Sequence, residues 1–352
     1  MMEKKKLGIG LIGYGGMGNW HVQTLSGIEE VKLCGIWDID PARRAAAVEQ
    51  GLHVYGSREE LLEDEAVEAV TIATPNDTHL PIALAVMGTG RHVICEKPVA
   101  LNSEELAQMV NYAKEMGVLF TVHQNRRWDE DYLIIKQLYD QNTMGKVFHI
   151  ESRVHGSRGI PGDWRNQKLH GGGMVLDWGV HLLDQMNMLL GKRMPISVYA
   201  QLTNVTNEAV DDGFRALFQF EDQLTFLVEV GTSNFISMPR WYMQGENGTA
   251  VIQDWSLKGE IVMVSDWEKR DAVPVVTAAG LTKTMAPRTE ETVKKYPLPE
   301  IHSDIRDFYR NVCDSIHNGA KALITCEEVT QVMQLMEAIF CSAEENKVVY
   351  FK

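Results

Sequence analysis

The chain has 352 residues, 45% hydrophobic and 23% charged, which is typical of a globular protein long enough for two domains. The formal net charge of −14 and the lack of a Lys/Arg cluster argue against a nucleic-acid partner. The apolar runs are too short to cross a bilayer, and the N-terminal residues lack a signal-peptide core, so we expect no membrane contact. The five cysteines have no paired spacing, which predicts reduced thiols in a cytoplasmic protein.

The first predicted strand, residues 7–12, runs directly into a GxGxxG motif. The motif consists of Gly13, Tyr14, Gly15, Gly16, Met17 and Gly18. Gly13 permits a tight turn, Gly15 lets a pyrophosphate approach the backbone, and Gly18 lets the following helix pack against the sheet. A glycine turn without a ligand is the alternative, but a strand before the motif and a helix after it favour a dinucleotide site.

A second predicted strand, 31–37, ends in Asp38, which lies 20 residues after Gly18. An acid at this position accepts hydrogen bonds from the adenosine ribose hydroxyls and disfavours a 2′-phosphate. We therefore predict NAD as the cofactor. Arg43, which we include in the cofactor site, and Arg44 lie close by and leave NADP possible.

Strands and helices then alternate, which predicts a doubly wound parallel sheet. Further strands are expected at 69–73, 91–95 and 118–122, and helices at 81–87 and 103–116. Ligands bind at the carboxyl ends of strands in such a sheet. On this basis the cofactor site also includes Thr74, Pro75, Asn76, His79, Glu96 and Lys97. The segment 74–79 would make a good turn even without a ligand.

Lys97 follows the strand expected at 91–95 and comes immediately before Pro98. A lysine at a strand end is commonly a solvated charge. Held in a cleft, it can instead donate a hydrogen bond to a substrate oxygen, and so stabilise an alkoxide during oxidation or polarise a carbonyl during reduction.

Residues 171–184, GGGMVLDWGVHLLD, begin with three glycines and continue as a predicted helix. Asp177 and His181 are four residues apart, which places them on one face of that helix. A carboxylate beside an imidazole can orient the ring and tune it as a general base. The alternative is a surface ion pair on an ordinary helix. Asp184 extends the same polar stripe.

The glycine motif with its strand-end acid, the EKP triplet at 96–98 and the DWGVH sequence at 177–181 together resemble the glucose–fructose oxidoreductase / inositol dehydrogenase / MocA (Gfo/Idh/MocA) family. The resemblance covers essentially the whole chain. It implies an α/β fold: an N-terminal Rossmann dinucleotide-binding domain (1–124) and a C-terminal α/β domain (125–352) with a large, mostly antiparallel open sheet for substrate binding and oligomerisation.

The resemblance also implies roles for individual residues. Lys97 matches the catalytic lysine of the family, His181 its acid/base histidine, and Asp177 the acid that precedes it. All three are predicted to contact the substrate. Asn125 and Arg127 match a segment between the domains, and the Lys97–Pro98 bond is expected to be cis.

The segment 155–170 is polar, Gly-rich and too long for a simple connection, which is typical of a binding loop. A surface loop anchored by its tryptophan fits the same pattern equally well. Trp164 could stack on a sugar ring. The side chains expected to bond hydroxyl groups are His155, Asp163, Arg165 and Lys168. A zinc site formed by His155, His170, Asp177 and His181 is disfavoured because no HxxxH or HExxH spacing supports it, so no metal is predicted.

Beyond residue 184, period-two patterns predict strands, and residues 271–299 lack a clear period and are expected to form an excursion or a partner-contacting arm. A helix is also expected at 129–142 and a strand at 147–154. The later strands are expected at 214–220, 224–230, 244–254 and 260–267, and amphipathic helices at 305–318 and 327–344. The exposed sheet face is the expected surface for a homodimer or homotetramer.

These features together predict an NAD-dependent dehydrogenase. It would transfer a hydride between the nicotinamide and a secondary hydroxyl or ketone of a sugar, glycoside or inositol. In this scheme His181 takes the hydroxyl proton, Asp177 orients and tunes it, and Lys97 bonds the same oxygen. Two alternatives stay open: a glycoside-cleaving enzyme that oxidises the sugar transiently, and a sugar or nucleotide sensor without catalysis.

Overall fold

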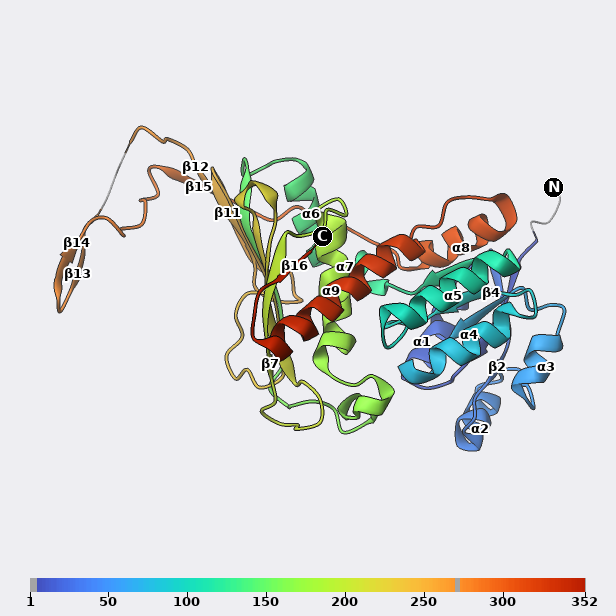
Figure 1. The fold of residues 1–352 in the computed structure, drawn as a ribbon. Coiled ribbons are helices and arrows are strands. Elements are labelled where there is room, and N and C mark those ends of the chain that lie inside the picture. The colour runs from blue at the N-terminus through green and yellow to red at the C-terminus, as the bar shows by residue number, and fades with distance from the viewer. Residues whose placement is uncertain (1–4, 270–272, 352) are drawn as a thin grey trace.

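The computed structural model describes residues 5–269 and 273–351, which form two large sheets with helices around them (Figure 1) and a small two-stranded sheet of β13 (Val275–Thr277) and β14 (Gly280–Thr282). The first sheet has five strands and the second has nine. Among the described residues, no helix is both long and apolar enough to cross a membrane.

The N-terminal sheet is parallel, with strand order β2-β1-β3-β4-β5, as predicted. Its strands are β1 (Leu7–Ile12), β2 (Val31–Trp37), β3 (Ala69–Ile72), β4 (His92–Cys95) and β5 (Phe120–Val122). The helices that connect them are α1 (Gly16–Leu25), α2 (Pro41–Glu49), α3 (Arg58–Glu63), α4 (His79–Met87) and α5 (Ser103–Met116). Each predicted element of this half lies within two residues of its observed bounds. The short helices α2 and α3 were not predicted.

Local sequence signals set the ends of α5. The Asn102 side chain accepts a hydrogen bond from the Glu105 backbone N–H at 2.8 Å, which caps the first turn. Gly117 closes the helix with a left-handed φ of 65°. Leu106, Met109 and other residues of its buried face pack against the sheet.

The second sheet follows β5 after a 3₁₀ turn, η2 (Asn125–Trp128), and the helix α6 (Glu130–Asp140). It has the strand order β15-β12-β11-β10-β6-β9-β8-β7-β16 and is antiparallel except for the β6–β9 pair. Four neighbouring strands of this sheet are β6 (Val147–His155), β9 (Thr225–Gly231), β8 (Gly213–Gln219) and β7 (Ser197–Thr203). The helices α7 (Val180–Leu189) and α9 (Cys326–Glu345) cover one face (Figure 1). This arrangement confirms the predicted fold class.

Alternation along β8 and β9 places Phe214, Phe218 and Phe226 in the core, as the period-two pattern predicts. One predicted strand is wrong: residues 244–254 belong to two strands, β10 (Trp241–Gly245) and β11 (Gly248–Ile252). The reason is the tight turn at Glu246–Asn247, which reverses the chain so that the two strands pair with each other.

The remaining elements complete the edges of the second sheet and the return of the chain to the first. β12 (Gly259–Val264) pairs with β15 (Val293–Tyr296), and β16 (Val349–Tyr350) pairs with β7. Of the expected excursion 271–299, residues 271–272 lie outside the described residues. The helix α8 (Arg306–Asn318) packs on α1 and β2 of the first half, so the C-terminal segment contacts both sheets.

Candidate active site

The glycine motif forms a tight turn between β1 and α1 in which side chains are excluded by the backbone. Gly13 has a φ of +94°, a conformation that L side chains rarely adopt. A Cβ atom on Gly18 would lie 2.1 Å from the Gly13 carbonyl oxygen, so the helix can approach the turn only with glycine there. Gly15 is the N-cap of α1, and no side chain caps the backbone N–H groups of the next residues, Gly16 and Met17. These free donors suit a phosphate group.

Asp38 lies at the end of β2 with its carboxylate directed at the same turn. Its Oδ2 accepts the Tyr14 backbone N–H at 2.6 Å, and its Oδ1 accepts the Asp40 N–H at 2.8 Å. The Arg43 guanidinium lies 3.5 Å from Oδ2 and is half-exposed. The acid and the arginine predicted from the sequence therefore meet beside the glycine turn.

The loop after β3 contributes backbone and side-chain bonds that join neighbouring strand ends. Thr74 and Pro75 start this loop at the carboxyl end of the strand. His79 is fully buried, with Nε2 2.9 Å from the Thr74 carbonyl and Nδ1 3.0 Å from the Pro98 carbonyl. Asn76 is also buried and donates to the Gly171 carbonyl at 3.1 Å. The side chains of His79 and Asn76 thus make bonds within the protein, and their predicted cofactor contacts stay predictions.

Lys97, at the end of β4, reaches across to the second half of the chain. The Lys97–Pro98 bond is cis, as the resemblance implied. The Lys97 Nζ donates to Asp177 Oδ1 at 3.1 Å and to the Asp177 carbonyl at 2.9 Å. The other carboxylate oxygen of Asp177 accepts from Arg165 Nε at 3.2 Å. One acid thus holds two cations, one from each half of the chain.

Asp177 lies in a π-helical turn, η5 (Val175–Gly179), that immediately precedes α7. In such a turn the hydrogen bonds span five residues, so the spacing that places i and i+4 on one α-helical face does not hold. Within residues 5–269 and 273–351, no hydrogen bond joins Asp177 to His181. The prediction that Asp177 pairs with His181 is therefore corrected, because the Asp177 carboxylate binds Lys97 and Arg165 instead.

The charges of Lys97 and Arg165 determine the protonation state of the buried Asp177 carboxylate. Burial raises the pKa of Asp177, but attraction to Lys97 and Arg165 outweighs burial and leaves the pKa below its ordinary value. Asp177 is therefore an anion near neutral pH.

His181 is nearly buried in the first turn of α7, and its ring packs edge-on against Trp178. Burial lowers the pKa of His181 well below the ordinary value, and the positive charges of Lys97 and Arg126 lower it further. The ring is therefore neutral near pH 7. Its Nδ1 is buried and has no hydrogen-bond partner among the described residues.

The three glycines before this turn are enclosed by backbone and by a buried acid. A Cβ on Gly172 would lie 2.2 Å from the Arg165 carbonyl oxygen, and one on Gly173 would lie 2.2 Å from Asp211 Oδ1. Asp211 accepts the Val175 backbone N–H at 2.8 Å at the start of the π turn. Burial raises the pKa of Asp211 to about 6. Sequence reasoning missed this residue, which lies more than 30 positions from the turn it supports.

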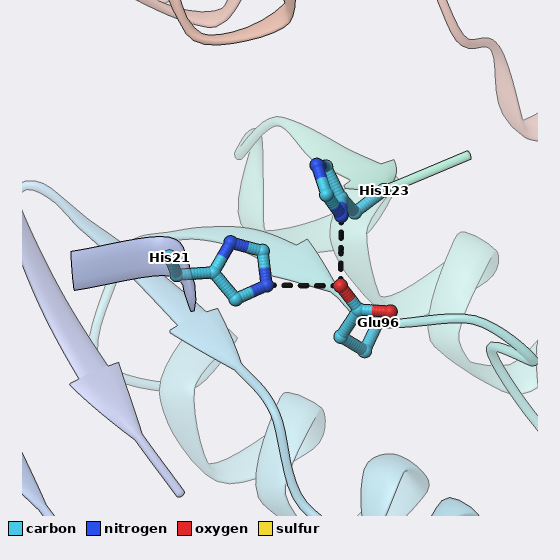
Figure 2. A group of neighbouring side chains, drawn as sticks. All are labelled: His21, Glu96 and His123. Carbon is cyan, nitrogen blue, oxygen red and sulfur yellow. Dashed lines mark hydrogen bonds and ion pairs between the residues drawn. The ribbon is translucent and has the colours of Figure 1, made fainter. Parts of the chain in front are cut away.

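Beneath Lys97, the Glu96 carboxylate joins two histidines from neighbouring elements (Figure 2). Glu96 Oε1 accepts from His21 Nε2 at 2.9 Å and from His123 Nδ1 at 2.7 Å, and Oε2 accepts the Lys97 backbone N–H at 3.0 Å. His21 also bonds the Tyr309 hydroxyl of α8. Burial raises the pKa of Glu96, but the two histidines outweigh it and hold the pKa well below the ordinary value.

The three ligating atoms of this cluster lie within 4.8 Å of one another, as a metal site would require. The hydrogen bonds just described already satisfy both oxygens of the carboxylate. Glu96 therefore points into the interior and fixes the backbone of Lys97, and its predicted contact with the cofactor stays a prediction.

The segment Asn125–Trp128 supplies a different arginine from the one predicted. Arg127 is buried, with a bidentate pair to Asp184 at 2.7 and 2.8 Å and a bond to Glu328 at 2.9 Å. Its guanidinium is therefore engaged within the protein, and its predicted substrate contact stays a prediction. Arg126 instead lies over the Trp178 ring, 4.3 Å from its centroid. Asn125 Oδ1 and Arg126 Nε are buried without hydrogen-bond partners in the described part of the chain, which marks this segment as a place for ligand contacts.

The residues of the predicted substrate loop lie in different parts of the structure. Arg165 and Trp164, in the turn η3 (Trp164–Asn166), reach the site: Arg165 bonds Asp177 and stacks on Trp164, 4.6 Å from the ring centroid. His155 does not join them, because alternation along β6 places it on the other face of the sheet, and its predicted substrate contact stays a prediction. There its Nε2 lies 3.6 Å from Glu229. Lys168 belongs to the short turn η4 (Lys168–His170).

The comparisons with known proteins agree with this geometry. Residues 7–124 match the model of an oxidoreductase family with an NAD-binding Rossmann fold, and residues 132–251 match the GFO/IDH/MocA C-terminal domain. The chain belongs to the Gfo/Idh/MocA oxidoreductase family. The family resemblance predicted from its motifs is thereby confirmed, as are its oxidoreductase class and its NAD-binding domain.

Three relatives illustrate the range of this similarity. The crystal structure of an NAD-binding protein from Listeria innocua is 48% identical, with a TM-score of 0.95, over 99% of this chain and 100% of that one. The scyllo-inositol 2-dehydrogenase (NADP(+)) IolW of Bacillus subtilis is 26% identical over 97% of this chain and 95% of its own. The fold is also that of GenD2 from gentamicin A biosynthesis, solved with NAD: 24% identity, a TM-score of 0.75, and coverage of 99% of this chain and 97% of GenD2.

Proposed function

We propose that this Gfo/Idh/MocA oxidoreductase is an NAD-dependent dehydrogenase that acts on a secondary hydroxyl of a ring polyol: a sugar, a glycoside or an inositol. The observation that carries the proposal is the position of His181. A neutral, nearly buried imidazole with a free Nδ1 lies close enough to the Lys97 ammonium for that charge to lower its pKa. A base and a hydrogen-bond donor at one place are what the oxidation of an alcohol requires.

The chain's own groups divide the work of this reaction. His181 accepts the hydroxyl proton in oxidation and returns it in reduction. Lys97 donates a hydrogen bond to the same oxygen and so stabilises the charge that develops on it. Asp177 fixes the Lys97 ammonium and the Arg165 guanidinium, and it acts on the substrate by positioning these two groups.

The residues around the glycine turn fit a dinucleotide. No side chain caps the N-terminus of α1 at Gly15, and the buried Asp38 carboxylate lies beside the turn from Gly13 to Gly18. When NAD is bound here, its nicotinamide supplies the hydride acceptor. Thr74 and Pro75, at the adjacent strand end, complete the proposed cofactor surface.

Asp38 and Arg43 favour opposite cofactors. The carboxylate repels a 2′-phosphate, whereas the half-exposed guanidinium attracts one. We therefore expect a preference for NAD that depends on Asp38: Asp38→Ser should shift the ratio of kcat/KM for NAD to that for NADP toward NADP by at least about tenfold, or 1.4 kcal/mol. Adding Arg43→Ala should remove most of the gain for NADP. A ratio that Asp38→Ser leaves unchanged would show that the acid only supports the turn through Tyr14.

The test of the function is a screen of the purified protein with NAD against inositols, sugars and glycosides, following reduced nicotinamide. With the best substrate, His181→Ala and Lys97→Ala should each lower kcat/KM by at least about 100-fold. The exposed His302 provides a matched control, and His302→Ala should have no effect. If either site variant stayed within about threefold of the wild type, less than 1 kcal/mol, its proposed role would be abandoned.

The same screen separates the alternatives. Accumulation of reduced nicotinamide supports the dehydrogenase. Release of an aglycone from a glycoside with no reduced nicotinamide would instead indicate the cleaving enzyme, in which the cofactor is reduced and reoxidised within one cycle. Binding of sugar and NAD with neither product would indicate a sensor.

A further inference from the structure

A half-exposed tryptophan, Trp255, lies in the turn that connects β11 to β12. The Gln253 backbone N–H donates to the Lys258 carbonyl at 2.7 Å across this turn, and the Leu257 side chain packs against the core. The turn is therefore ordered, yet Trp255 is 51% exposed. A single exposed apolar residue is ordinary, so the case for a role of Trp255 depends on its neighbours.

Two arginine side chains fix the Trp255 ring. The Arg240 guanidinium lies 4.9 Å from the ring centroid and the Arg126 guanidinium 5.3 Å, distances at which a cation attracts an aromatic face. Arg240 is buried and donates to Ser152 Oγ at 2.7 Å and to Gln185 Oε1 at 3.1 Å. The indole is thus held from one side by buried groups, while half of its surface stays open.

Trp255 belongs to a series of rings that starts at the candidate base. The His181 and Trp178 ring centroids are 5.8 Å apart, and the Trp178 and Trp255 centroids are 6.2 Å apart. Arg126 lies over both tryptophans. Exposure rises along the series, from 5% at His181 through the half-buried Trp178 to Trp255. The series therefore leads from the base outward to solvent.

This order indicates the size of the substrate. A ring that places its hydroxyl group at His181 lies next to Trp178, and a group attached to the outer side of that ring reaches Trp255. Aromatic side chains contribute large apolar contact areas, and the apolar face of a second ring can bury the open side of an indole. A substrate with a single ring leaves Trp255 uncovered.

The charges around the series indicate a neutral substrate. Each cation near the rings already pairs with a carboxylate of the chain, so the site does not require an anion on the ligand to balance it. The pairs are Arg126–Asp129 at 2.9 Å, Arg240–Asp131 at 3.0 Å, Lys97–Asp177 at 3.1 Å and Arg165–Asp163 at 2.7 Å.

We propose that Trp255 is a specificity-determining residue: its open indole face binds the outer group of a neutral glycoside whose inner ring is oxidised at His181. This inference rests on the proposed function, because it places the reacting ring at His181. It narrows the substrate class from ring polyols in general to glycosides with a second ring.

The test compares glycosides that differ only beyond the reacting ring. The probes are the methyl and phenyl β-glucosides and the methyl and phenyl β-galactosides, with NAD as the oxidant. In the wild type, KM for the phenyl glycoside of a pair should be lower by at least about tenfold. Trp255→Ala should remove this difference by raising KM for the phenyl glycoside, with kcat within about threefold of the wild type. Trp255→Phe retains an aromatic face and should keep most of the difference.

Trp267 provides a matched control in the same half of the chain. It is 55% exposed and also has an arginine over its ring, Arg288 at 4.9 Å, but it does not belong to the series that starts at His181. Trp267→Ala should keep the preference for the phenyl glycoside. Equal effects of Trp255→Ala on the methyl and phenyl glycosides would overturn the inference and leave Trp255 as a support for Arg126.

Calorimetric titration of the NAD-bound protein with the same four glycosides separates this inference from the proposed function. Tighter binding of phenyl glycosides that is lost in Trp255→Ala, with no reduced nicotinamide formed, would contradict the dehydrogenase and support the binding role of Trp255. Turnover that Trp255→Ala leaves unchanged would do the reverse. A wild type that favours the phenyl glycoside neither in turnover nor in binding would also overturn the inference.

Discussion

Burial and two nearby cations keep the imidazole of His181 neutral, which is the form that a general base requires. Burial is the largest cause of its lowered pKa, and Lys97 and Arg126 act in the same direction. Arg126 is itself fixed by the Trp178 ring and by a bond to Asp129 at 2.9 Å. A residue next to the predicted Arg127, in the same segment, thus lowers the pKa of His181 although the resemblance gave it no role.

The pH profile of the enzyme should report this tuning. In oxidation, activity needs neutral His181, so kcat/KM falls as the pH drops through its pKa, which lies well below the ordinary value. Arg126→Met removes one of the cations that depress this pKa, so the pKa rises and the acid limb of the profile moves to higher pH. The position of the limb is the measurement, because the variant can also lower the plateau through lost substrate contacts.

Arg58→Met is the matched control, since Arg58 lies on α3 and pairs with its neighbour Glu59. It should leave the acid limb in place. An acid limb that does not move in Arg126→Met, or that moves to lower pH, would contradict the assignment of this limb to His181.

At the level of elements, the sequence is sufficient for most of the fold because local rules and long-range rules agree there. The glycine turn, the cap of α5 and the apolar strands of the first sheet each carry their own signal. The pattern fails where geometry is not local. The π turn at Val175–Gly179 is set by bonds to Asp211 and by close packing of Gly172 and Gly173, none of which a helical period reveals.

The candidate site, like the fold, was predictable only in part. Lys97, Asp177 and His181 follow from motifs, and the structure brings all three together with Arg165. Their pairing was not predictable, because it depends on which way the chain turns before α7. Arg126 lies within the matched segment between the domains, but the resemblance gave the role to Arg127. Asp211 carries no motif of its own, and only burial and distance identify it.

The glycine turn allows a direct test of element packing. Gly18→Ala places a Cβ 2.1 Å from a backbone oxygen that cannot move aside, so we expect a loss of about 1–3 kcal/mol in the free energy of unfolding. NAD binding should weaken with it. Gly16→Ala, two residues earlier in the same helix, meets no protein atom within 4 Å and should stay within about 1 kcal/mol of the wild type. Denaturant unfolding without cofactor compares the two variants. Equal losses would show that close packing of α1 is not what selects glycine at residue 18.

On the scale of the whole molecule, the C-terminal helices connect the two sheets. The side chain of Glu337 on α9 accepts the Ser103 backbone N–H of α5 at 2.7 Å, and Ser342 of the same helix accepts the Ala200 N–H of β7 at 2.9 Å. α8 packs on α1, where Tyr309 reaches the buried His21. The substrate half of the chain is therefore anchored to the cofactor half at a point directly beneath Lys97.

Removal of the Tyr309 hydroxyl should show what this anchor contributes. Tyr309→Phe leaves His21 Nδ1 without its buried partner, so we expect the free energy of unfolding to fall by about 1–2 kcal/mol. Tyr350→Phe is the control: Tyr350 is 71% exposed, and its change should stay within about 0.5 kcal/mol. Because α8 and α9 tie both sheets together, denaturant unfolding followed by circular dichroism should show one transition in the wild type and in both variants. Two separate wild-type transitions would mean that the halves are stable independently. Equal effects of the two substitutions would mean that the contact between Tyr309 and His21 does not couple the halves.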